Sequence, residues 1–178
     1  DTDHVGAELA LPGGATGLID RWFAHVDAAM VQRLPADVLA GMKIRERITA
    51  LVEARMALHA PHRESLRRAL SILAMPQNLP LAARLGWRAA DTMWRLAGDT
   101  ASDFNHYTKR MTLSAVYAST MAVFIDDESE DYAESRAFLA RRIDGVMRFE
   151  KWKAGRKARA DYRPSLSRFV GRLRYPVV

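Results

Sequence analysis

The fold of this chain is best indicated by the stretch Gly98-Asp-Thr-Ala-Ser-Asp-Phe-Asn-His-Tyr-Thr-Lys-Arg110. A glycine here is typical of a helix end, and the polar residues after it offer several N-caps for a new helix. His106, Tyr107 and Arg110 are spaced so that they share one face of that helix. The stretch therefore predicts two antiparallel helices joined by a short polar turn.

The rest of the chain also has helical periodicity, and no segment alternates polar and β-branched apolar residues as a strand does. We expect a first helix between the Pro12-Gly13-Gly14 turn and Pro35. The further helices are expected at about residues 37–59, 63–75, 79–97, 103–125 and 131–147, the last opened by an Asp131/Glu134 capping box. The predicted fold class is an all-α antiparallel helical bundle.

Composition divides the chain into a body, residues 1–148, and a basic tail, residues 149–178. Of the 27 Lys and Arg residues, ten lie in residues 148–178 with two of the 21 acidic residues, so this segment carries +8 and the remainder −2. Such a local excess indicates an anionic partner for the tail. No apolar run approaches the 18 residues of a membrane span, and neither a signal peptide nor an initiator Met is present.

Catalytic and metal-binding motifs are not found. The chain has no cysteine, which excludes disulfides, thiolate metal sites and a cysteine nucleophile. It has no Glu-x-x-His pair, nucleophile elbow or phosphate-binding glycine loop. His59 and His62 flank Pro61 at a helix end without a carboxylate at ligand spacing, so we expect no metal there. We predict a protein that is not an enzyme and has no cofactor.

Four segments resemble one known family, the ubiquinone-biosynthesis accessory proteins that form the ninth member of the coenzyme Q set. They are Gly98–Arg110 and, beside it, Ala69-Leu-Ser-Ile-Leu-Ala-Met-Pro-Gln-Asn-Leu-Pro80, Met93-Trp94 and Asp131–Met147. The resemblance covers roughly residues 13–148. It implies a TetR-like helical bundle that lacks most of its N-terminal helix-turn-helix.

The same resemblance implies the function of a non-catalytic lipid-binding protein. It would bind isoprenoid quinone intermediates and present them to the demethoxyubiquinone hydroxylase at the membrane. The location implied is the bacterial cytoplasm, peripheral on the inner membrane, or alternatively the matrix face of the mitochondrial inner membrane. The rival hypothesis is the ligand-binding half of a TetR-like transcriptional regulator.

Apolar side chains of the third to fifth helices are candidates for lining a lipid cavity, and ordinary core packing is the alternative. The candidate lipid-binding residues are Leu70, Leu73, Leu85, Trp87, Leu113, Val116, Tyr117 and Phe124.

The residues on either side of the 98–103 turn are candidates for a docking patch, because Trp, Tyr and Arg commonly anchor interfaces. The resemblance implies that matching positions meet the hydroxylase; a helix-end packing cluster is the alternative. The candidates are Asp91, Met93, Trp94, His106, Tyr107 and Arg110. His106 stands where animal members of the family carry Trp.

The basic tail contains a short amphipathic pattern, which is typical of helices that bind a membrane surface. A helix packed on the body and a nucleic-acid contact are the alternatives, the latter less favoured because no known binding module surrounds it. The candidate membrane-binding residues are Leu166, Arg168, Phe169, Val170, Arg172 and Leu173. The fifth helix has a face of small residues, Ala115, Ala118 and Ala122, which suits a dimer interface and tight internal packing equally well. As in TetR-like folds, we expect a homodimer.

Overall fold

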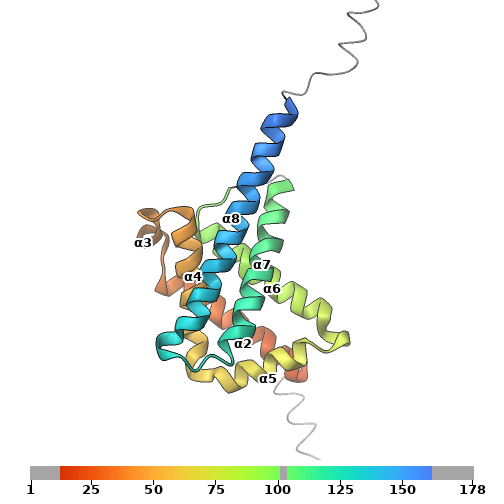
Figure 1. The fold of residues 1–178 in the computed structure, drawn as a ribbon. Coiled ribbons are helices and arrows are strands. Elements are labelled where there is room, and N and C mark those ends of the chain that lie inside the picture. Colours follow the sequence, from red (N-terminus) through yellow and green to blue (C-terminus); the bar gives the residue numbers. More distant parts are fainter. Residues whose placement is uncertain (1–12, 101–103, 162–178) are drawn as a thin grey trace, which may run out of the picture. The chain divides into compact units, whose positions relative to one another are not determined.

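The computed structural model describes residues 13–100 and 104–161, and every regular element in those two ranges is helical (Figure 1). The α-helices are α2 (Gly14–Arg33), α3 (Ala36–Ala40), α4 (Ile44–His59), α5 (Arg63–Leu73), α6 (Leu79–Leu96), α7 (Phe104–Phe124) and α8 (Ala133–Asp161). Short 3₁₀ turns at Ala60–His62, Pro76–Asn78 and Glu130–Tyr132 precede α5, α6 and α8. The predicted all-α fold class is confirmed.

Two compact units divide the chain after Ile143, within α8, and each is described by itself. The first unit holds the helical bundle. In it α6 packs most extensively against α7 and also touches α2, α4 and α5, while α2 lies along α4. The core comes from one apolar stripe of each helix; among its members are Met30, Leu51, Leu66, Met93, Met121, Phe124 and Leu139.

The expected single helix over residues 37–59 is wrong, because α3 ends at Ala40 and α4 begins at Ile44. Arg47 stabilises the break, donating from Nε to the Met42 carbonyl at 2.8 Å and from Nη2 to the Ala40 carbonyl at 2.9 Å. These carbonyls are left without helical partners at the break, and a guanidinium satisfies both of them.

The predicted Asp131/Glu134 capping box is also wrong. Asp131 has a left-handed φ of 51° and lies in the 3₁₀ turn before α8. The first amides of α8 are instead accepted by upstream side chains: Ser135 N–H donates to Asp127 Oδ2 at 2.8 Å, and Glu134 N–H donates to Ser129 Oγ at 3.1 Å. A buried carboxylate at a helix N-terminus is favoured by the helix dipole as well as by these hydrogen bonds.

Among the helices of the described residues, none is long and apolar enough to span a bilayer.

Candidate functional site

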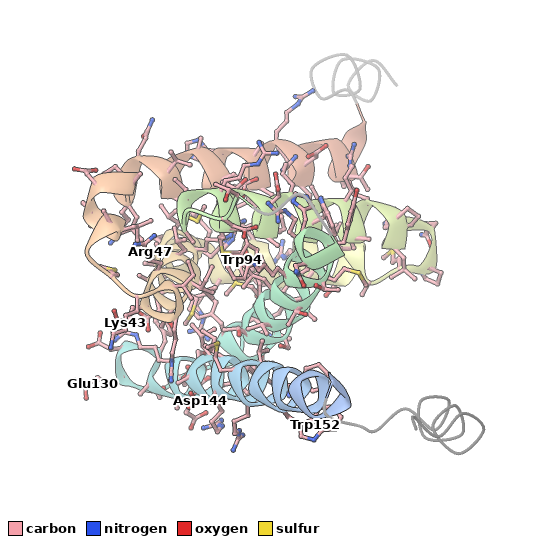
Figure 2. The ribbon with its side chains drawn as sticks, turned by 90° about the horizontal axis from the view of Figure 1, so that it is seen from above. Lys43, Arg47, Trp94, Glu130, Asp144 and Trp152 are labelled. Atoms are coloured by element: carbon pink, nitrogen blue, oxygen red, sulfur yellow. The ribbon has the colours of Figure 1, made fainter. Side chains whose placement is uncertain are left out.

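The corner between α6 and α7 is built on Gly98. Its φ of +88° is the left-handed conformation that glycine adopts at helix ends, and Asp99 N–H then donates back to the Trp94 carbonyl at 2.9 Å. Arg47 Nη1 donates to the Ala97 carbonyl at 2.8 Å and would lie 3.2 Å from a Cβ at Gly98. Figure 2 labels Arg47 and Trp94, which lie on α4 and α6. The corner is thus fixed from three helices.

An ion-pair cluster under this corner joins α6 to α7. Arg110 is 2% exposed; its Nε donates to Asp91 Oδ1 at 2.6 Å and its Nη1 to Asp99 Oδ2 at 3.0 Å. Lys109 Nζ approaches the other oxygen of Asp99 at 2.6 Å. Because Arg110 and the fully buried Met93 present no surface to a partner, their role at this corner is to support it.

Trp94 is half-buried beside the same cluster. Its indole N–H donates to the Lys109 carbonyl at 3.1 Å, and the Lys109 ammonium lies 5.3 Å from the ring centroid. Both contacts fix the indole against the first turns of α7. Trp94 therefore has a structural role in the corner and retains only part of its surface for binding.

The exposed part of the corner is an aromatic patch formed by Trp87, His106, Tyr107 and Met111. Tyr107 is 57% exposed and Met111, one turn further along α7, is 64% exposed. The Tyr107 ring lies 5.2 Å from the His106 ring and 6.0 Å from the Trp87 ring. Trp87, expected to line a lipid cavity, here lies beside two of the predicted docking residues. Met111 was not among the predicted site residues, although its i+4 spacing from Tyr107 could have indicated it.

The other residues predicted to line a lipid cavity lie in the bundle core. Leu70 is half-buried. The buried ones are Leu73, Leu85, Leu113, Val116, Tyr117 and Phe124. They come from α5, α6 and α7, as expected. Their assignment to a lipid cavity stays a prediction.

A separate apolar groove of about 510 Å³ lies between α2, α5 and the turn before α5. Its apolar surface comes from α2 and from one face of α5, and His62 lies at the turn. Residues that line it include Leu18, Ile19, Trp22, His62, Ala69 and Ile72. None of them was among the predicted lipid-binding residues. A signal in the sequence was Leu18, which belongs to the apolar stripe of the first helix and is 52% exposed in the structure.

Behind the groove lies a buried polar cluster of Arg55, His59 and Tyr117, whose side chains are 0%, 0% and 5% exposed. Arg55 pairs through Nη1 with Asp27 Oδ1, and its guanidinium carbon lies 4.8 Å from the centroid of the Tyr117 ring. The Tyr117 hydroxyl lies 3.4 Å from His59 Nε2. Burial, followed by the positive charge of Arg55, lowers the pKa of His59 to about 3, so this imidazole is neutral at physiological pH.

Among the described side chains, no group of three or more His, Asp or Glu is arranged to hold a metal ion.

The six predicted membrane-binding residues of the tail, between 166 and 173, lie outside the described residues. In the second unit, the described part of α8 carries Phe149 and Trp152 one turn apart. They are 56% and 55% exposed, and their rings stack with centroids 5.8 Å apart.

The helical architecture and its corner define a TetR-like body. The structure of the TetR transcriptional regulator from Nitrosomonas europaea superimposes with a TM-score of 0.59, covering 71% of this chain and 70% of that one at 23% identity. This likeness concerns the fold alone, and it confirms the predicted TetR-like bundle.

The sequence indicates which family of TetR-like proteins this chain resembles. Residues 79–150 match the COQ9 family model. The mitochondrial ubiquinone biosynthesis protein COQ9 of Rattus norvegicus is 42% identical over 96 residues, which are 54% of this chain and 31% of that protein. The protein of the same name from Drosophila melanogaster is 26% identical over 143 residues, or 78% of this chain and 44% of its own length. These matches confirm the predicted resemblance and show that residues 79–150 are similar to the COQ9 family.

The chain thus spans about a third to under a half of the curated relatives it matches. The part matched by the family model contains α6, α7, the corner and the whole aromatic patch. The α2–α5 groove and Arg55 precede that part.

Proposed function

We propose that this protein is a non-catalytic accessory protein of ubiquinone biosynthesis. It binds isoprenoid quinone intermediates and presents them to the demethoxyubiquinone hydroxylase at a membrane surface. The observation that carries this proposal is the match of residues 79–150 to the COQ9 family, together with relatives named for ubiquinone biosynthesis.

The aromatic patch is the proposed docking surface for the hydroxylase. Exposed aromatic side chains on a rigid base are typical of interface hot spots, because they bring large contact area at a low cost in conformational entropy. Here the base is the Arg110 ion-pair cluster, whose paired carboxylates on α6 and on the turn fix the start of α7. Tyr107 and Met111 are the central residues of this surface.

The bound isoprenoid lipid needs an apolar site, and the bundle offers two candidates. One is the predicted cavity among the buried residues of α5, α6 and α7. The other is the α2–α5 groove, whose volume of about 510 Å³ lies within the range of small-molecule sites. The groove is open, so a long isoprenoid chain could lie along it and continue into the bilayer.

The basic tail is the proposed membrane contact. Electrostatic attraction is worth roughly 1 kcal/mol per Lys or Arg near an anionic leaflet, and residues 148–178 contain ten of these residues. Exposed Trp152 is of the residue type that sits at the level of the lipid head groups, and exposed Phe149 is of the type that inserts as part of an apolar face. The names of the relatives point to the mitochondrion, so the matrix face of its inner membrane joins the bacterial inner membrane as the proposed location.

Solvent extraction and mass spectrometry of the natively purified protein test the lipid-binding role. We expect an isoprenoid quinone or a related isoprenoid lipid. Leu18→Asp should lower its amount, because it puts a charge into the groove, whereas Val31→Asp, on the same helix and 39% exposed, is the matched control. Lipid retained equally in both variants assigns the lipid to the interior cavity, and a lipid-free wild-type protein contradicts the proposal.

The alternative, the ligand-binding half of a TetR-like regulator, has only the fold in its favour.

A further inference from the structure

Arg55 is a fully buried cation with part of its hydrogen-bonding capacity unused. Nη1 pairs with Asp27, and one face of the guanidinium lies over the Tyr117 ring. Nε and Nη2, the two nitrogens on one edge of the group, have no hydrogen-bond partner among the residues that the structure describes. That edge is the fork that binds carboxylates, phosphates or two neighbouring oxygens in a bidentate manner.

The surroundings do not compensate for these two unpaired donors. Asp27 is already shared, since its Oδ2 accepts from Arg88 Nε at 2.9 Å, and Arg88 also binds Asp20 through Nη1 at 2.6 Å. A buried donor left without a partner costs roughly 1–3 kcal/mol, and more when it is charged. The ion pair with Asp27 accounts for Nη1 alone, so it does not explain why Nε and Nη2 are also buried here.

His59 adds a third unpaired nitrogen on the same side of α4. It lies four residues after Arg55, on the same helix face, and its Nδ1 is buried without a partner. The imidazole is neutral, and the Tyr117 hydroxyl can donate to Nε2; in that tautomer Nδ1 carries the proton. Arg55 and His59 together then present three buried donor nitrogens, Nε, Nη2 and Nδ1, for which no acceptor is found in the described part of the chain.

Trp22 connects this cluster to the α2–α5 groove. Its indole lines the groove, and the same ring packs edge to face on the His59 ring with centroids 5.2 Å apart. On the groove side the Trp22 ring also lies 6.5 Å from the ring of His62. The polar cluster is therefore one aromatic ring away from the apolar groove, at its inner side.

We propose that Arg55 and His59 receive the polar head of an amphiphile whose apolar tail lies in the α2–α5 groove, and that this head presents two adjacent acceptor oxygens. The guanidinium edge takes the pair of oxygens, and the His59 Nδ1–H donates to one of them. The inference rests on the proposed lipid-binding function. Two kinds of head fit the chemistry: the neighbouring oxygens of a substituted quinone ring and the carboxylate of a fatty acid.

Three probes with the same ten-carbon tail test the proposal by calorimetry on the full chain. Decylubiquinone and decanoate carry paired acceptor oxygens, whereas decan-1-ol carries a single hydroxyl. Arg55→Lys keeps a cation for Asp27 but removes the fork, and His59→Leu removes the Nδ1 donor. Arg45→Lys is the matched control, because Arg45 is exposed on the same helix and is not among the residues that line the groove.

We expect Arg55→Lys and His59→Leu each to weaken at least one of the two-oxygen probes by on the order of tenfold, and decan-1-ol by less than about threefold. The probe that loses affinity identifies the quinone or the carboxylate as the head group. If Arg55→Lys does not fold, as circular dichroism would show, His59→Leu decides alone. If wild-type protein binds decylubiquinone and neither variant changes the affinity for decylubiquinone or for decanoate, the head-group site alone is refuted. If wild-type protein binds no probe, the lipid-binding function is refuted as well.

Discussion

Truncation of Tyr107 tests whether the aromatic patch is a docking surface or a packing cluster at a helix end. Tyr107 is 57% exposed, so of the roughly 200 Å² typical of a buried tyrosine about 115 Å² remain available to a partner. At about 25 cal/mol per Å² this area corresponds to an upper limit of about 3 kcal/mol. We therefore expect Tyr107→Ala to cost about 2–3 kcal/mol of binding free energy, or about thirtyfold to more than a hundredfold in the Kd for the hydroxylase.

The same substitution should leave the fold almost intact. Within the protein, Tyr107 contacts the His106 and Trp87 rings at the surface, and such contacts contribute about 1 kcal/mol or less each. Arg110→Ala is the opposite case. It leaves Asp99, whose side chain is 5% exposed, with one cation fewer, and breaking a buried pair typically costs about 3–5 kcal/mol of stability.

Calorimetric titration with the purified hydroxylase, combined with thermal unfolding followed by circular dichroism, measures both effects. Met111→Ala belongs to the same patch and should also weaken binding, whereas Val38→Ala, 49% exposed on α3, should not. Unchanged affinity in Tyr107→Ala and Met111→Ala would refute the docking role of the patch. A large loss of thermal stability in Tyr107→Ala would show that the ring is a packing residue.

Three further predictions concern stability, membrane binding and assembly. Burial raises the pKa of Asp127, but hydrogen bonds from Ser129 and Ser135 outweigh the effect of burial and hold this pKa at about 2, against 3.8 in the unfolded chain. The carboxylate should therefore contribute about 2 kcal/mol to the stability of the fold above pH 4, and this contribution should be lost as the pH falls towards 2. Urea unfolding should thus show Asp127→Asn destabilised at pH 7 and equal to wild type near pH 2, with little effect of Asp126→Asn at either pH. In flotation with anionic liposomes, the full chain should float with the liposomes and be released by salt, whereas a chain ending at Met147 should stay unbound. Equal flotation of the two chains would show that the tail is not the membrane contact. Light scattering should give a dimer mass for wild type and a monomer mass for Ala118→Glu, since Ala118 is exposed on α7; a monomeric wild type contradicts the dimer.

The helices could be predicted from the sequence because their apolar stripes and their stop signals agree. Gly98 ends α6 within a residue of its expected position, and Pro76 follows directly on the region where α5 stops. The two errors have a common cause. The break before α4 depends on Arg47, which reaches back to the carbonyls of Met42 and Ala40, and the start of α8 depends on Asp127. Neither side chain lies at the local spacing of a capping motif.

The candidate site was predictable only in part, for a related reason. Helical spacing places His106, Tyr107 and Arg110 on one side of α7, but it does not tell which of them faces water. Arg110 is buried because Asp91 and Asp99, both before α7 in the chain, converge on it. The groove escaped prediction because its walls, α2 and α5, are separated by two other α-helices in the sequence.

The two proposed activities occupy different faces of one helix. Tyr107 of the docking patch and Tyr117 of the buried polar cluster are ten residues apart on α7, which corresponds to about 15 Å along its axis. Tyr107 is exposed and Tyr117 is buried, so a head group held by Arg55 and His59 does not lie at the docking surface. Holding the lipid and presenting it are then separate steps, and the head group must leave its polar site before a docked hydroxylase can receive it. If docking favours that release, linkage requires the reverse effect of equal size: a bound head group must weaken docking by the same factor. The Arg55→Lys protein, in which the head group is held less tightly, should show that dependence reduced.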